Sequence, residues 1–65
     1  MDDDVLLDTP TAAKLLGMSR QWLEAKRAEG TGPPFLKLGT SRLSPVRYRR
    51  SAILRYMEEC ERAPA

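Results

Sequence analysis

Residues 9–30 read TPTAAKLLGMSRQWLEAKRAEG, and this stretch decides how the chain folds. Thr9 followed by Pro10 predicts a helix start, because threonine caps helices and proline is tolerated in their first turn. Gly17 predicts the end of that helix through a left-handed cap. Ser19, two residues later, predicts the cap of a second helix. The first helix has only about two turns, so it is stable only when packed against a partner.

The second helix is expected to run from Arg20 to Glu29 and to end at Gly30. Trp22 and Leu23 are expected to point inward. Two short helices joined by a tight turn form a helix-turn-helix. The side chains expected on its outer side are Arg20, Gln21, Glu24 and Arg27.

A β-hairpin is predicted after the second helix. Residues 31–34 read TGPP and end the helical pattern. Residues 35–38 and 46–49 then read as two strands, and in the second strand Arg47 and Arg49 alternate with apolar residues. This alternation predicts one packed face and one exposed cationic face. The connecting loop, Gly39 to Pro45, carries Arg42 near its tip and forms a candidate wing.

The two ends of the chain complete the predicted domain. Residues 5–7 read VLL and are expected to be a short apolar entry segment. The last helix is expected from Ser51 to about Arg62, with an apolar stripe that closes the core; its members are Ala52, Ile53, Tyr56, Met57 and Cys60. The prediction is therefore one domain over residues 1–65, mainly α with a small β-hairpin, in which residues 1–4 and 63–65 are flexible tails.

Charge is distributed unevenly along the chain. The whole sequence has a net charge of +2, but residues 9–57 contain ten basic residues and only two acidic ones, a net +8. The compensating acidic residues lie near the two ends. A basic body between acidic ends suits a polyanionic partner, although a solvated charged surface has the same composition.

The composition excludes several classes of function. The single cysteine, Cys60, has no disulfide partner within the chain, and no histidine joins it in a metal site. No nucleophile–base pair, paired carboxylate in the basic body or glycine-rich phosphate loop is present, so we expect no enzyme, cofactor or metal. No apolar run reaches the length of a membrane span. A reduced, cytoplasmic setting is expected.

Three blocks of sequence resemble one family. Residues 9–20 (TPTAAKLLGMSR), 32–39 (GPPFLKLG) and 46–51 (VRYRRS) are similar to the small excisionase and AlpA-type DNA-binding proteins of phages and integrative elements. The resemblance covers roughly residues 6–59 and implies a winged helix-turn-helix like the DNA-binding part of MerR regulators. Lys26 departs from the family because it stands at an aliphatic position; either its stem lies along Trp22 or the hairpin, or the helix is rotated. The wing segment is also longer than usual.

Helix-turn-helix proteins place the second helix in the major groove. Arg20 is expected to read guanine and Gln21 adenine, whereas Glu24 either accepts from cytosine or orients a neighbouring arginine. The residues expected to contact DNA from this helix are Ser19, Arg20, Gln21, Glu24 and Arg27, and those from the wing and strand are Arg42, Arg47 and Arg49. The wing and strand arginines are expected to meet phosphates or the adjacent minor groove, making binding salt-dependent.

These features leave several functions open. The first is a recombination directionality factor that binds attachment-site DNA and directs a tyrosine integrase toward excision, as the resemblance implies. The second is an AlpA-like transcription regulator. A third, a protein–protein adaptor, predicts an exposed apolar patch, and the sequence indicates none beyond the core. The acidic run 2–4 is either a solvated tail or a contact with the basic face of a neighbouring copy, which would support cooperative binding to DNA.

Overall fold

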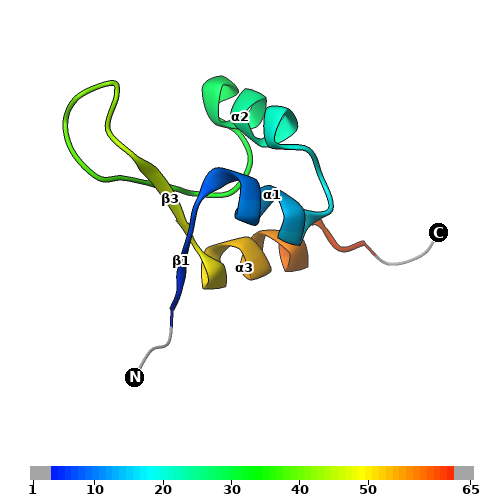
Figure 1. The fold of residues 1–65 in the computed structure, drawn as a ribbon. Helices are drawn as coiled ribbons and strands as arrows, with labels where there is room; N and C mark the ends of the chain where they lie inside the picture. The colour runs from blue at the N-terminus through cyan, green and yellow to red at the C-terminus, as the bar shows by residue number, and fades with distance from the viewer. Residues whose placement is uncertain (1–3, 63–65) are drawn as a thin grey trace.

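The computed structural model describes residues 4–62 and has the predicted mainly helical, winged helix-turn-helix architecture (Figure 1). Helix α1 packs against both α2 and α3, and the wing extends to one side of this helical body. No helix within residues 4–62 has the length and apolar character needed to cross a membrane. The elements in chain order are β1 (Leu6–Leu7), α1 (Thr9–Leu16), α2 (Arg20–Glu29), β2 (Leu36–Lys37), β3 (Val46–Arg49) and α3 (Arg50–Cys60).

The turn between α1 and α2 is formed as predicted. Gly17 adopts a left-handed conformation with φ of 73°, and Gly30 ends α2 with φ of 78°. The Ser19 hydroxyl caps α2 by accepting a hydrogen bond from the Trp22 N–H at 3.1 Å. Glycine fits both helix ends because other residues are strained at positive φ.

The cap of α1 is Asp8 rather than the predicted Thr9. A carboxylate oxygen of Asp8 accepts a hydrogen bond from the Thr11 N–H at 3.0 Å. Thr9 is therefore inside the first turn, where its side chain is buried against the rest of the domain. Hydrogen bonds from Thr11 hold the pKa of Asp8 below its usual 3.8, because they stabilise the charged carboxylate.

The entry segment is an edge strand, which the sequence did not indicate. Leu6 and Leu7 in β1 pair antiparallel with Arg49 and Tyr48 in β3, giving a three-stranded sheet in the order β1-β3-β2. The other edge of β3 pairs with β2 as predicted. A strand of two residues is too short to show alternation, so its sequence gives no period-2 signal. Pairing nevertheless satisfies backbone groups on the otherwise open edge of β3.

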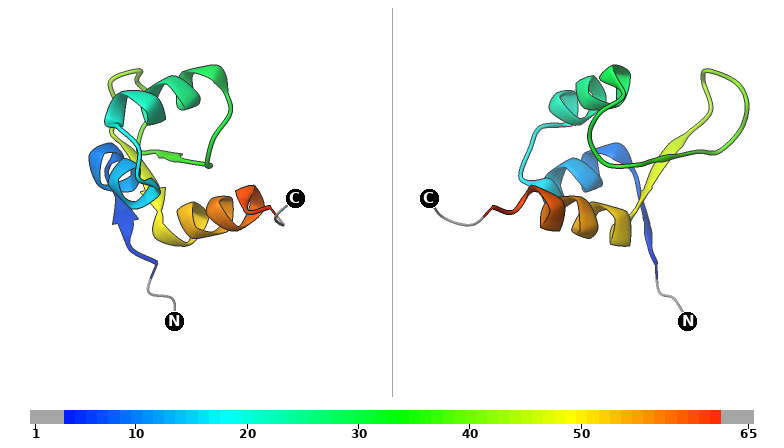
Figure 2. Two further views of the ribbon diagram at one scale, coloured as in Figure 1. Left: turned by 90° about the vertical axis from the view of Figure 1, so that its right-hand side faces the viewer. Right: turned by 180° about the vertical axis from the view of Figure 1, so that it is seen from behind.

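The core lies where α1, α2, α3 and β3 meet (Figure 2). Two of its members are alanines on α1, and their small side chains allow neighbouring helices to approach closely. Trp22 is half-buried and packs against this core, as expected for the only indole. The fully buried apolar side chains are Ala12, Ala13, Leu23, Tyr48 and Ile53.

Helix α3 follows its predicted stripe for most of its length but not at its end. Ile53 is buried and Met57 is half-buried, whereas Cys60 is exposed and the helix ends there rather than at Arg62. The last turn lies beyond the packed body, so its apolar position gains no burial. Desolvation, with a contribution from Cys60, raises the pKa of Tyr56 above its usual 10.0.

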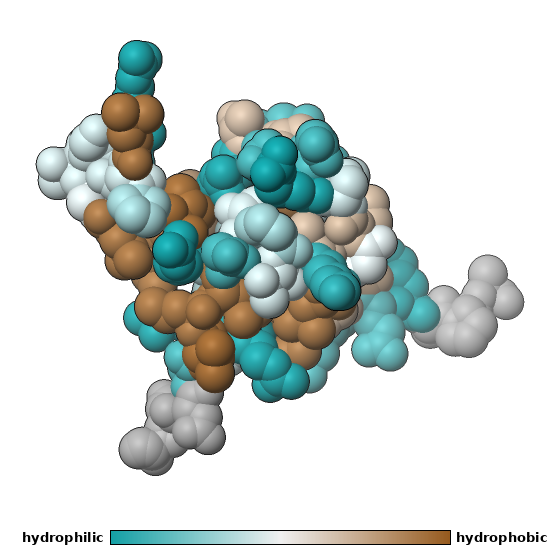
Figure 3. All heavy atoms as spheres, viewed as in Figure 1, coloured by the Kyte–Doolittle hydropathy of each residue, from teal (hydrophilic) through white to brown (hydrophobic). Residues whose placement is uncertain are grey.

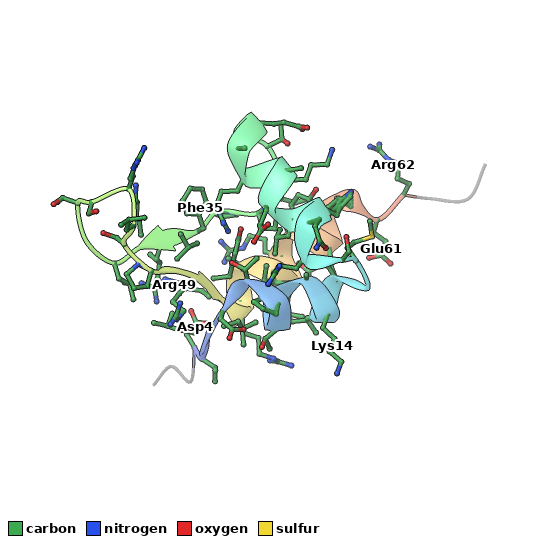
Figure 4. All side chains as sticks on the ribbon, turned by 45° about the horizontal axis from the view of Figure 1, so that its top comes forward. Asp4, Lys14, Phe35, Arg49, Glu61 and Arg62 are labelled. Carbon is green, nitrogen blue, oxygen red and sulfur yellow. The ribbon has the colours of Figure 1, made fainter. Side chains whose placement is uncertain are left out.

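Part of the predicted N-terminal tail is held in place. Asp4 accepts hydrogen bonds from the Ser51 backbone N–H at 3.1 Å and from the Ser51 hydroxyl at 2.8 Å. Its carboxylate also lies 3.7 Å from the Arg49 guanidinium (Figure 4). Asp4 thus caps α3 from a distant part of the chain, since Arg49 at the N-cap position makes no side-chain cap. The other predicted tail residues, 1–3 and 63–65, lie outside the described residues.

Candidate nucleic-acid interface

The N-terminal half of α2 presents the predicted base-reading side chains to solvent. Arg20, Gln21 and Glu24 are all exposed. Ser19 precedes them, and its hydroxyl is engaged in capping α2. The Arg20 guanidinium lies 3.5 Å from the Glu24 carboxylate, an i,i+4 pair between exposed side chains. In the free protein, Glu24 therefore occupies the arginine-orienting position that was one of its two predicted roles.

A basic groove of about 480 Å³ separates α2 from the wing. It is open rather than enclosed, and side chains from three parts of the chain line it: the start of α1, the outer side of α2, and the wing with β3. The arginines along this groove are Arg20, Arg27, Arg42 and Arg47. The carboxylates along it are Asp8 and Glu24, so the arginines outnumber them by two and the groove favours an anionic occupant.

Arg27 faces inward, contrary to the prediction. One of its terminal nitrogens donates to the Thr9 hydroxyl at 3.1 Å and to the Tyr48 hydroxyl at 3.0 Å. Its guanidinium also lies 5.8 Å from the centre of the Phe35 ring. The signal was present in the sequence, because Arg27 follows Leu23 by four residues and therefore shares its helix face. Arg27 connects α2 to α1 and β3 at the bottom of the groove.

Lys26 follows one of its two predicted alternatives. Its stem is partly covered, and its ammonium lies 5.5 Å from the centre of the Trp22 ring and 3.7 Å from the Glu29 carboxylate. Lys26 thus lies along Trp22, with its ammonium group over the indole ring. Gly32 allows the following loop to pass here, since a β-carbon at this residue would lie 3.0 Å from the Lys26 β-carbon.

The wing is an ordered turn despite its length. The Ser41 hydroxyl accepts a hydrogen bond from the Leu43 N–H at 3.0 Å, and the Ser44 hydroxyl accepts one from the Ser41 N–H at 3.0 Å. Gly39 packs so closely that a β-carbon there would collide with the Ser44 hydroxyl. This arrangement places Arg42 and Leu43 at the exposed tip.

The structure separates the two strand arginines. Arg47 is half-buried beside the groove and donates to its neighbouring Val46 carbonyl at 2.8 Å. Arg49 is half-exposed, contacts Asp4, and borders a different hollow of about 250 Å³, which Phe35 and Arg55 also line. Strand alternation predicted that both arginines lie on one cationic face. Of the two, only Arg47 lines the basic groove, because Arg49 lies at the end of β3 that pairs with β1.

More apolar surface is exposed than the sequence indicated. Side chains of this kind gather around β1 and on the wing (Figure 3). Apart from one at the wing tip, they lie outside the lining of the basic groove. The exposed large apolar residues are Val5, Leu6, Leu15, Met18, Phe35, Leu38 and Leu43.

A family model described as a helix-turn-helix domain matches residues 6–61, which include every helix and strand found within residues 4–62. The chain therefore belongs to this family of small excisionase- and AlpA-like DNA-binding proteins. It is a DNA-binding helix-turn-helix protein, and its partner is double-stranded DNA. No curated protein and no solved structure gives a significant match to the chain.

Proposed function

We propose that this protein binds a specific site in duplex DNA, with α2 in the major groove and the wing against the adjacent backbone. The observation that supports this most directly is the basic groove between them, where Arg20 from α2, Arg42 from the wing and Arg47 from β3 converge. Exposed side chains at the start of the second helix are the ones that reach base edges in this motif. No catalytic step is part of the proposal.

Each side chain has a separate proposed role. Arg20 reads guanine and Gln21 reads adenine, because their donors and acceptors match those base edges in the major groove. Glu24 holds Arg20 in place across their 3.5 Å ion pair, or accepts from cytosine once Arg20 has turned to the bases. Ser19 lies beside them, at the N-terminus of α2, and is proposed to contact a phosphate of the DNA backbone there.

The wing and strand arginines are proposed to position the protein rather than read sequence. Arg42 is exposed at the wing tip, and Arg47 lies beside the groove, so both can neutralise phosphates. Arg49 reaches only DNA that extends past the β1 side of the sheet. Arg27 supports the recognition helix from below, since its donors are directed to Thr9 and Tyr48.

Fluorescence anisotropy tests this assignment. The protein is titrated against the attachment-site or promoter duplex proposed as its target, with a scrambled duplex for comparison. Arg20→Ala should weaken binding to the specific duplex by about 5- to 150-fold and remove most of the selectivity. Arg42→Ala should weaken binding to both duplexes similarly and reduce the dependence of log affinity on log salt by about one.

Lys14→Ala is the matched control. It removes the same charge from an exposed side chain on α1 that points away from α2 (Figure 4). Binding by this variant should remain near that of the wild type. If Arg20→Ala and Lys14→Ala bind DNA equally well, the proposal that α2 reads bases in the major groove is wrong. If the wild type binds no duplex even at low salt, the DNA-binding assignment fails and an adaptor function through the exposed apolar side chains becomes the better explanation.

The cellular role proposed first is that of a recombination directionality factor, which directs a tyrosine integrase toward excision at attachment-site DNA. Membership in the excisionase- and AlpA-like family supports this role. An AlpA-like transcription regulator is the alternative, because the same surface serves a promoter. An adjacent integrase gene, and increased excision when the protein is added to that integrase in vitro, would distinguish the first role from the second.

Cooperative binding of several copies along DNA is proposed as part of the first role. A single module covers little DNA surface, so repeated sites increase the total contact. The sequence suggests the acidic run 2–4 as a contact with the basic face of a neighbouring copy. Asp4 is hydrogen-bonded to Ser51 within its own chain, so this contact is assigned to Asp2 and Asp3, which lie outside the described residues. Analytical ultracentrifugation with a multi-site duplex should show binding beyond independent occupancy, and strictly independent monomers would refute it.

A further inference from the structure

The tip of the wing carries an apolar side chain that the groove chemistry does not explain. Leu43 is 85% exposed, whereas the next most exposed large apolar residue, Val5, is 55% exposed. Leu43 does not cover the core or pack on the strands. Its exposure therefore either has no function or allows Leu43 to contact a partner at the wing tip.

Leu43 is held in its exposed position by the wing turn. Its N–H donates to the Ser41 hydroxyl, and the Ser44 N–H donates to the Ser41 carbonyl at 2.9 Å. Gly39 and the Ser44 hydroxyl close the base of the same turn. A side chain on a braced turn can be pressed against a partner without folding back, because the backbone behind it is already hydrogen-bonded.

The neighbours of Leu43 identify the chemistry of that partner. Leu43 lines the basic groove together with Arg42 from the wing and Arg20 from α2. In the space-filling view the wing projects away from the body and ends in apolar and charged side chains (Figure 3). An anion seated along the arginines is thus in reach of Leu43, and duplex DNA is the polyanion to which the proposed function assigns this groove.

We infer that Leu43 is a wedge that enters the minor groove beside the site read by α2 and partly unstacks one base step, so that the DNA kinks toward the major groove. This inference rests on the proposed function. Aliphatic side chains act in this way in DNA-bending proteins, because an apolar group replaces part of the stacking that it opens. Arg42, next in the chain, holds the phosphates on either side, and a flexible pyrimidine–purine step is the preferred point of entry.

The experiment uses a duplex of about 30 bp selected from a random library by the wild-type protein, labelled at both ends for energy transfer. A second set of the same duplex carries 2-aminopurine, placed in turn at successive base steps next to the bases that α2 reads. All measurements are made at saturating protein, which separates bending from affinity. The wild type should bend the duplex by about 20–90° and raise 2-aminopurine fluorescence at one step only.

Leu43→Ala should abolish the 2-aminopurine signal and remove at least half of the change in energy transfer. Leu43→Met should retain both, because methionine is also a large apolar side chain and has a similar volume. Leu38→Ala is the matched control: Leu38 is an exposed leucine at the base of the same wing and is absent from the lining of the groove. It should bend DNA like the wild type. The thermal midpoints of all three variants should stay close to that of the wild type, since Leu43 is largely exposed and Leu38 is half-exposed.

A bend and a fluorescence signal that persist unchanged in Leu43→Ala would overturn the wedge, as would equal losses in Leu43→Ala and Leu38→Ala. Neither result would affect the proposed function, because selective binding is measured separately. The proposed function fails if the library yields no enriched site and Arg20→Ala has no effect. In that case a loss of partner binding in Leu43→Ala would identify the wing tip as a protein contact instead.

Discussion

Arg27 donates from a single guanidinium nitrogen to two hydroxyls, those of Thr9 on α1 and Tyr48 on β3. The Tyr48 side chain is fully buried, so its hydroxyl depends on this one charged partner. Removing a partner from a buried polar group costs more than the hydrogen bond itself contributes, because the remaining group stays desolvated. Arg27 is therefore a structural residue of α2 before it is a contact for any ligand.

Arg27→Ala should lower the free energy of unfolding by about 1–3 kcal/mol, measured by urea denaturation. The double variant Arg27→Met with Tyr48→Phe should recover part of this loss, because it replaces both members of the Arg27–Tyr48 pair with apolar groups and leaves only the Thr9 hydroxyl without its donor. If Arg27→Ala weakens DNA binding at unchanged stability, Arg27 is a DNA contact, as the sequence predicted, and its structural role is minor.

At the scale of elements, the first turns of two helices, α1 and α3, are capped by aspartates whose function depends on their charge. Asp8 caps α1, and Asp4 caps α3 across 47 residues of sequence. The pKa of Asp4 is lowered chiefly by the backbone hydrogen bond from Ser51, and that of Asp8 by Thr11. Because the pKa values of both aspartates are lower in the folded state, their carboxylates bind protons more tightly in the unfolded chain. Their contribution to stability is complete above about pH 3.8 and is lost as the pH falls through the lowered values.

The thermal midpoint should thus change little between pH 7 and pH 5 and fall below about pH 4. Asp4→Asn combined with Asp8→Asn should flatten this fall, since asparagine retains a cap oxygen but does not titrate. Circular dichroism melts over this pH range measure both. Asp4→Ala at neutral pH should lower the midpoint by about 4–8 °C, and an unchanged midpoint would show that the contact with Ser51 does not stabilise α3.

At the scale of the whole molecule, stability depends on a small core. A chain of 65 residues is expected to be stable by only about 3–10 kcal/mol. Ile53→Ala should cost about 2–5 kcal/mol, a large part of this total, because Ile53 is fully buried where α3 meets α1. Leu15→Ala, on an exposed side of α1, should cost much less. Equal melting temperatures for these two variants would contradict the core described above.

The features that could be predicted from sequence are those with a local cause. Gly17, Ser19 and Gly30 act on backbone groups within a few residues, so the bounds of α2 were correct. The exposed Arg20 and Gln21 follow from helix periodicity in the same way.

The features that were missed depend on distant partners. Asp4 meets Ser51, and β1 meets β3, only after the chain has folded, and neither pairing leaves a pattern in the nearby sequence. The grouping of Arg42 with Arg20, and the separation of Arg49 from both, follow from the course of the wing rather than from spacing.

The pairing of β1 with β3 also determines when this domain can form during synthesis. Arg49, the partner of Leu6, is made only after both α1 and α2 have been synthesised. The sheet and the cap of α3 cannot close on a partly translated chain, even though α1 and α2 are already complete. Folding of this domain is therefore delayed until β3 and α3 have emerged, and a nascent chain stalled before β3 exposes the side chains of α1 and α2 that β3 and α3 would otherwise cover.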